Sequence, residues 1–207
     1  MTAGMAAVVG APFLNVQQGT GKCDAKADVK ALRPKEPAFR RIDNSEEARK
    51  SGEVLMKNHR RGKNIVHHTL RGEGLLEEYE IYVSNDQQEM VAVCYIGKDM
   101  CGYPGAVHGG VSAALIDNTA GWHYLVLGEK KPGVTAFLNL NYRTRIKADS
   151  AVVIHCKVKK VQGRKYFIDV VMKDAAGKTL VDAEALFVQL KPSWTMWIGQ
   201  KLMEWGF

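Results

Sequence analysis

The feature that most constrains the fold of this chain is the segment 109–128, in which Asp117 is the one residue with a formal charge. The segment carries Leu115, Ile116 and Trp122 among small residues, and a helix that is apolar on most sides is normally buried. A helical Asp is ordinarily a surface residue, because burying an ionised carboxylate is costly unless it is paired or has a shifted pKa. The uncharged surroundings favour the opposite case here. We therefore predict a buried central helix in which Asp117 has a chemical role.

Composition indicates an ordinary globular protein. The 207 residues suit one domain with terminal additions, and 46% are hydrophobic while 25% are charged. Polar residues and glycines within 109–128 argue against a membrane span. The four cysteines form no CxxC pair and are sparse, which favours reduced thiols in an intracellular compartment and gives no sign of zinc. We expect no cofactor and no metal.

The two ends of the chain differ in pattern from its middle. Residues 1–43 lack periodicity and are expected to form a loosely ordered arm. Residues 44–62 predict a helix, since Asn44 can cap it and Glu47 follows three positions later. Because the first residues have no basic n-region, we expect no secretory signal and favour the cytoplasm, with the mitochondrial matrix as the alternative. Residues 192–207 are expected to form a short, aromatic helical tail that packs on the protein.

The middle of the chain predicts a sheet around the central helix. Apolar alternation or β-branched and aromatic residues mark six strands, in the ranges 79–83, 90–96, 135–142, 152–161, 166–172 and 180–190. Turn residues separate the first two strands and the last three, which predicts consecutive antiparallel hairpins. Residues 97–105 are expected to be a loop. The order predicts an α+β fold, in which one curved antiparallel sheet wraps around a long central helix.

At this point the chain resembles a known family, the hotdog-fold acyl-CoA thioesterases. The resemblance rests on the stretch GYPGAVHGG at 102–110, on an Asp nine positions after His108, and on VTAFLNLNYR at 134–143. It is greatest for the phenylacetate-type branch and, within it, the group named thioesterase superfamily members 4 and 5. It covers roughly residues 74 to 190, and it implies a hotdog domain at 74–191.

Thioester hydrolysis needs an oxyanion stabiliser and a group that activates or supplies the nucleophile. The backbone N–H groups of Gly109 and Gly110 lie at a helix start, where such groups are unpaired, and they could donate to the carbonyl oxygen of a thioester. Two glycines equally suit a tight turn. The resemblance implies that Asp117 is the general base or the nucleophile, and the two mechanisms stay open. It also implies that Thr135 reaches the site from the partner subunit. His108 either touches the thioester or only orients the loop.

The net charge of +7 favours an anionic partner. Acyl-CoA carries phosphates, and the basic residues nearest the family motif that could bind them are Arg143, Arg145 and Lys147. The alternative is that these residues are only the solvated end of a strand. Asn139 and Asn141 precede them in the motif and complete the expected substrate-binding set. Nucleic acid is disfavoured because no helix-turn-helix, zinc-finger or RNP pattern accompanies the charge.

We therefore predict hydrolysis of medium- to long-chain fatty acyl-CoA to free acid and CoA, as part of fatty acid metabolism. By resemblance, the protein is a homodimer or a dimer of dimers with shared active sites. A hotdog module that binds acyl-CoA or a protein without turnover is the alternative, and a hydratase or dehydratase is a further one. A serine hydrolase is excluded by the lack of a GxSxG motif.

Overall fold

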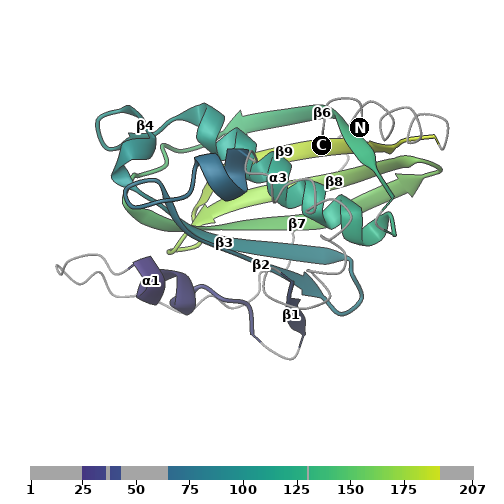
Figure 1. Cartoon of the computed structure of the whole chain (residues 1–207), viewed down its shortest axis with the longest axis horizontal. Coiled ribbons are helices and arrows are strands. Elements are labelled where there is room, and N and C mark those ends of the chain that lie inside the picture. The colour runs from purple at the N-terminus through teal and green to yellow at the C-terminus, as the bar shows by residue number, and fades with distance from the viewer. Residues whose placement is uncertain (1–24, 36–37, 43–64, 130, 192–207) are drawn as a thin grey trace, which may run out of the picture.

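A computed structural model describes residues 25–35, 38–42, 65–129 and 131–191. Its centre is a seven-stranded antiparallel sheet in the order β1-β2-β3-β7-β8-β9-β6, with the helix α3 across one face (Figure 1). The strands are β1 (Phe39–Arg41), β2 (Leu76–Ser84), β3 (Glu89–Ile96), β6 (Gly133–Tyr142), β7 (Ser150–Gln162), β8 (Lys165–Asp174) and β9 (Thr179–Gln189), and the helix is α3 (Gly109–Leu127). The predicted α+β class, strands and central helix are confirmed.

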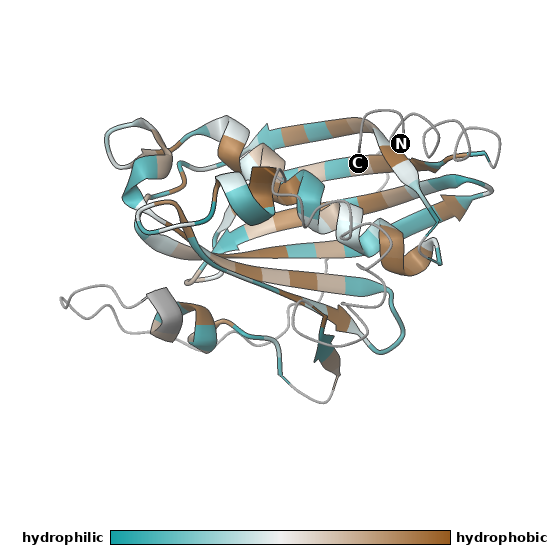
Figure 2. Ribbon diagram, in the orientation of Figure 1, coloured by the Kyte–Doolittle hydropathy of each residue, from teal (hydrophilic) through white to brown (hydrophobic). Residues whose placement is uncertain are grey.

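The core lies between α3 and the sheet. Leu115, Ile116, Ala120 and Tyr124 are buried on the side of the helix that packs into the main apolar cluster. The strands contribute every second residue to this cluster, as in β7, and the alternation is visible as colour changes along the strands in Figure 2. This period-two pattern defines the inner face of the sheet.

The helix is less deeply buried than its composition predicts. The sheet covers one side only, so Asp117, Asn118 and Trp122 on the other side are half-buried. An apolar helix that keeps one side partly open must have a use for that side, either as a binding surface or as a contact with another chain.

The order of the strands goes beyond the predicted hairpins. β2–β3, β7–β8 and β8–β9 are the expected antiparallel neighbours. β6, however, crosses to the far side of the sheet and pairs with β9, while β3 pairs with β7. Turn residues reveal adjacent hairpins, but they cannot reveal where a strand goes after a long helix.

The loop predicted at 97–105 contains short regular elements. These are the 3-10 turn η2 (Lys98–Met100) and the strand β4 (Cys101–Tyr103), which pairs with the following strand β5 (Ala106–Val107). A further short element, the π-helical turn η1 (Ile65–Thr69), lies before β2 and lines the pocket described below. The sheet and the site therefore use residues that lie before residue 74, where the domain is expected to begin.

Part of the predicted arm is ordered. The helix α1 (Ala25–Ala31) packs on the outer face of the sheet, where Val29 and Leu32 join Tyr82, Val93 and Tyr95 in a second apolar cluster. Residues 1–24 of the arm, the whole of the predicted helix at 44–62 and the tail at 192–207 lie outside the described residues. Within the described ranges, no helix combines the length and hydropathy needed to cross a membrane.

A buried carboxylate fastens this N-terminal segment to the sheet. Glu80 on β2 is 5% exposed at its side chain and accepts two hydrogen bonds from Arg33, at 2.7 and 2.6 Å. Arg41 lies 3.0 Å away and the Tyr82 hydroxyl donates at 2.7 Å. Burial raises the pKa of Glu80, but the hydrogen bonds and charges of these three partners outweigh it and hold the pKa below its usual value.

Candidate active site

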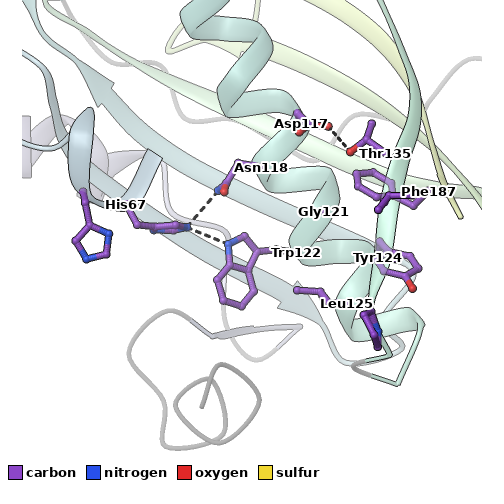
Figure 3. Close-up of a pocket in the computed structure, with 13 residues that line it drawn as sticks. His67, Asp117, Asn118, Gly121, Trp122, Tyr124, Leu125, Thr135 and Phe187 are labelled. Carbon is purple, nitrogen blue, oxygen red and sulfur yellow. Dashed lines mark hydrogen bonds between the residues drawn. The ribbon is translucent and has the colours of Figure 1, made fainter. Parts of the chain in front are cut away.

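Asp117 lies in the middle of α3 at the side of a pocket of about 440 Å³ (Figure 3). The hydroxyl of Thr135 donates a 2.9 Å hydrogen bond to its Oδ1 atom. Thr135 is on β6, where the pairing with β9 shifts by one residue between Thr135 and Phe137. A bulge of this kind re-aims the side chains beside it, and it accompanies the turn of Thr135 toward the helix. The two predicted residues therefore meet within one chain, which corrects the expectation that Thr135 comes from the partner subunit.

A polar network forms one wall of the pocket. The Trp122 indole N–H donates to Nε2 of His67 at 3.2 Å, and the two rings meet edge to face at 5.9 Å. The amide nitrogen of Asn118 is 3.4 Å from the same Nε2 atom. Since Nε2 accepts these N–H groups, a neutral His67 carries its proton on Nδ1. Figure 3 shows His67 reaching toward Trp122 and Asn118 from η1.

The network continues into the core through Tyr79. Asn118 donates to the Tyr79 hydroxyl at 2.9 Å, and this hydroxyl lies 2.9 Å from the Thr119 hydroxyl. Thr119 donates its own proton to the Leu115 carbonyl at 2.7 Å, so Tyr79 is the donor to Thr119. Burial raises the pKa of Tyr79 well above its usual value and keeps it protonated. The amide of Asn118 is thereby fixed in orientation next to Asp117.

An aromatic stack closes the opposite wall. The rings of Tyr124 and Phe187 lie 5.4 Å apart and are nearly parallel, and Tyr166 meets Tyr124 edge to face at 5.1 Å. The Tyr124 hydroxyl donates to the Lys131 carbonyl at 2.9 Å. Burial raises the pKa of Tyr124 to about 12, so the hydroxyl keeps the proton that it donates. A pocket with mainly apolar walls and a few fixed polar groups is typical of small-molecule sites.

The start of α3 has a different arrangement from the predicted one. The Nδ1 atom of His108 accepts the Gly110 N–H at 2.9 Å, so His108 caps the helix and this N–H is not unpaired. In the described part of the chain, the Gly109 N–H donates to no group, and it remains available for an oxyanion. The Tyr142 hydroxyl donates to the Gly109 carbonyl at 2.8 Å, and a Cβ on Gly109 would approach that hydroxyl to 3.3 Å. Glycine at position 109 thus allows Tyr142 to pack closely against the helix start, in addition to leaving the N–H accessible to a substrate.

The structure does not bring all the predicted catalytic residues to one point. Asp117 and Thr135 are together, whereas Gly109 is eight positions earlier on α3, or about 12 Å along the helix axis at 1.5 Å per residue. That distance is too long for one thioester group to contact both. In a single chain there are two half-sites, one with the carboxylate and one with the helix start.

The half-site at the helix start has the predicted basic residues beside it. Gly109, Tyr142, Arg143 and Arg145 line a second hollow of about 290 Å³. Arg145 is exposed, and Arg143 is engaged with Asp182 through its Nε and Nη2 atoms. This pairing raises the pKa of Arg143 and, with burial opposing it, holds the pKa of Asp182 down.

The remaining predicted binding residues are more dispersed. Asn141 donates to Asp182 at 3.0 Å, and Asn139 is an exposed residue of β6 opposite Glu184. Lys147 is exposed and its backbone carbonyl accepts from Ser150 at 2.6 Å. The basic segment directly follows β6, which ends at Tyr142, the predicted end of this strand.

His67 and the aromatic stack are absent from the predicted site. The stretch around His67 lies between a predicted helix and a predicted strand and has no motif, so nothing in the pattern marks it. Phe187 lies in the strand predicted at 180–190, and its contact with the pocket depends on the pairing of β9 with β6. Among the described residues, no three His, Cys, Asp or Glu side chains are grouped so as to hold a metal ion. The expectation that no cofactor is needed stays a prediction.

Comparison with known proteins gives a family match over part of the chain. Residues 104–181 match the model of the thioesterase superfamily. The hotdog fold is likewise supported by a Streptococcus pneumoniae structure, described as a hypothetical thioesterase protein with coenzyme A, which has a TM-score of 0.51 and 24% identity over 55% of this chain and 87% of that chain. The predicted hotdog fold and the predicted resemblance to the thioesterases are confirmed.

The chain is also similar to curated proteins, of which two are described here. Acyl-coenzyme A thioesterase THEM4 of Rattus norvegicus is 36% identical over 121 residues, which are 58% of this chain and 51% of that protein. A Candida albicans protein named as uncharacterized and mitochondrial is 26% identical over 121 residues, or 55% of this chain and 53% of that protein. The chain spans about half the length of the curated relatives it matches.

Proposed function

We propose that this protein hydrolyses acyl-CoA thioesters to a free acid and CoA, with Asp117 as the general base or the nucleophile. The observation that carries the proposal is the Asp117–Thr135 hydrogen bond at the side of a largely apolar pocket. A carboxylate held by a hydroxyl can take a proton from water or attack a carbonyl, and the apolar walls suit an acyl group. The names of THEM4 and of the pneumococcal structure with coenzyme A support the same substrate class.

The geometry supports a site shared between two copies. Because one chain keeps Gly109 about 12 Å from Asp117 along the helix, the carbonyl of a substrate at Asp117 needs its oxyanion donor from elsewhere. The ten-residue strand β6 is an edge of the sheet in the described chain, and antiparallel pairing of two β6 strands would set two α3 helices side by side in opposite directions. We infer that Asp117 and Thr135 of one copy act with Gly109 of the other, in a homodimer or a dimer of dimers.

The same pairing gives the basic residues a role. Arg145 and Arg143 lie beside Gly109 and would face the CoA portion of a thioester whose carbonyl is held there. The finer parts of the proposal are a preference for medium- to long-chain acyl groups, a role in fatty acid metabolism, and an intracellular location. The cytoplasm is the favoured compartment, and the mitochondrial name of the Candida relative supports the matrix as the alternative.

The proposal is tested by measuring the hydrolysis of acyl-CoAs of graded chain length, with the released CoA thiol as the readout. We expect Asp117→Asn to lower kcat by about 10²- to 10⁴-fold, the usual contribution of a general base, while CoA binding and thermal unfolding stay close to wild type. Glu129→Gln is the matched control, since it neutralises an exposed carboxylate just beyond the end of the same helix. Binding without turnover in the wild type would favour the non-catalytic module instead. Turnover that survives in Asp117→Asn would contradict the assigned role.

A complementation experiment tests the shared site. Asp117→Asn and Gly109→Val are each expected to be inactive, yet a mixed dimer would contain one site in which both residues are intact. After the two variants are unfolded and refolded together, random pairing should restore about a quarter of wild-type activity. No recovery from a mixture that sedimentation shows to be dimeric would exclude the shared site.

A further inference from the structure

Gly121 is an unusual residue for its position. It lies one turn after Asp117 on α3, inside the helix, and it lines the pocket. Glycine is among the least favourable residues within a helix, because it loses the most backbone entropy on folding. A glycine at such a position therefore calls for a structural or functional reason.

The backbone supplies no such reason. Gly121 has helical geometry, and a Cβ built on it would lie 3.6 Å from the Cε1 atom of Phe187, an ordinary van der Waals distance. Gly133, on the same pocket, is a useful contrast, since a Cβ there would overlap the Tyr124 ring. Alanine would fit at 121 but not at 133. What the missing side chain at 121 provides is space in the pocket.

The walls on either side of this space are fixed. Figure 3 shows Trp122 and Phe187 on opposite sides of Gly121. Trp122 is held by its 3.2 Å hydrogen bond to His67, and Phe187 is stacked on Tyr124 at 5.4 Å. Because neither ring can move aside without losing these contacts, the size of residue 121 decides how much of the slot between them is open.

We infer that an acyl chain held at Asp117 runs past Gly121 between Trp122 and Phe187, and that residue 121 sets the longest acyl group accepted. This inference rests on the proposed thioesterase activity. Asp117 and Gly121 are about 6 Å apart along the helix axis. An acetyl group is shorter than that and ends before Gly121, whereas an octanoyl or palmitoyl chain is longer and must pass it.

The test uses the full chain and three forms of residue 121, namely wild type, Gly121→Ala and Gly121→Leu. The measured quantity is the ratio of kcat/KM for octanoyl-CoA to kcat/KM for acetyl-CoA. We expect this ratio to fall at least tenfold in Gly121→Leu and by a smaller factor in Gly121→Ala. The alanine variant should unfold at the same temperature as wild type or higher, because alanine is the better helix former and its methyl group fits. It therefore keeps the test valid if the leucine variant folds poorly.

The outcomes are distinguishable. An unchanged ratio in both folded variants, or an equal loss for short and long chains, overturns the role of Gly121 and leaves the thioesterase activity in place. A wild-type protein that hydrolyses no acyl-CoA overturns the proposed function and this inference with it. A graded fall in the ratio from glycine to alanine to leucine supports the inference.

Discussion

The hydroxyl of Thr135 and the carboxylate of Asp117 are joined by a 2.9 Å hydrogen bond that links the edge strand β6 to the middle of α3. The hydroxyl is the donor, so its effect is to orient the carboxylate and stabilise its negative charge. Thr135 is therefore a positioning residue for Asp117, and its contribution is separable from that of the carboxylate itself.

Replacing Thr135 by valine keeps its shape and removes the donor. Hydrogen bonds to charged groups contribute about 1.5–3 kcal/mol, so Thr135→Val should lower kcat by about 10- to 100-fold. Thr135→Ser retains the hydroxyl and should stay within about threefold of wild type. Steady-state kinetics of both variants decide the matter, and full activity in Thr135→Val would show that the hydrogen bond is dispensable.

His67 is predicted to stabilise the pocket wall through Trp122. His67→Leu leaves the indole N–H without its acceptor and should cost about 1–2 kcal/mol of unfolding free energy, whereas His67→Gln offers an acceptor and should cost less. Urea unfolding measures this difference. If the His67–Trp122 pair also holds the acyl slot, His67→Leu should lower the octanoyl-to-acetyl ratio and His67→Gln should restore it. Equal effects of the two substitutions on stability and on the ratio would contradict the hydrogen-bonding role.

Arg145 is predicted to bind the phosphates of CoA. Arg145→Ala should raise KM for acyl-CoA by about fivefold to tenfold with little change in kcat, the pattern expected when a contact is lost equally in the ground and transition states. Raising the salt concentration should weaken substrate binding by wild type more than by the variant. Lys178→Ala in the β8–β9 turn removes the same charge elsewhere and is the control. An identical rise in KM in both variants would point to net charge alone.

The Glu80 cluster predicts how the N-terminal segment is held. Glu80→Ala removes the carboxylate that Arg33 and Arg41 share and should cost about 2 kcal/mol of unfolding free energy, less than for a fully buried pair because both arginines are about a third exposed. Limited proteolysis should then cut within residues 25–42 before the sheet unfolds. Protection equal to wild type would mean that the apolar cluster of Val29 and Leu32 holds the segment by itself.

His123 predicts a pH dependence of stability. Its Nε2 atom is 2.9 Å from the Gln87 carbonyl, and its Nδ1 atom is buried and has no partner in the described structure. Burial lowers the pKa of His123, with the charge of His155 acting in the same direction and Glu89 against it. The unfolded chain therefore binds a proton more readily than the folded protein does. The stability that the neutral His123 contributes is fully present above the pKa of an unfolded histidine, about 6.5. It is lost as the pH falls through that value toward the lower pKa of His123 in the folded protein.

The measurement is the unfolding free energy at pH 7.5 and at pH 5.5, in wild type and in His123→Gln. The wild type should lose more stability than the variant over this interval. His155 and Glu89 remain in both proteins and form their own 3.1 Å contact, so the difference between the two proteins reports His123. Parallel pH profiles would show that His123 does not titrate in this range.

The sequence predicts the parts of this structure whose signals are local. The uncharged helix, the period-two strands and the hairpins after Gln162 and Asp174 follow from residues close together in the chain, and so does the position of Asp117 on the helix. The pairing of β6 with β9 depends on how the chain returns after α3, which no local pattern encodes. The same long-range return brings Phe187 to the pocket and turns Thr135 toward Asp117 within one chain.

Other parts were hidden for a different reason. His67 lies outside any motif, so its place in the site could not be predicted from the sequence. It becomes evident only from its hydrogen bond with the indole of Trp122. The N–H of Gly110 looked free because helix starts lack internal partners, and its capping by the ring of His108 depends on a side-chain rotamer. The ordered helix α1 lies in a stretch whose glycines and prolines pointed to irregular structure, and packing on the sheet decides its conformation.

The two rims of the sheet are built differently. One ends in β1, a strand of three residues that includes Arg40 and Arg41, and short charged strands resist the addition of further chains. The other ends in β6, which is long and carries Val134 and Tyr142 about half exposed. Within the described residues, β6 is therefore the edge better suited to pairing with another chain, and two copies that pair along β6 are left with their β1 edges. The short charged strand β1 would then keep such pairs from growing further along the sheet into fibres.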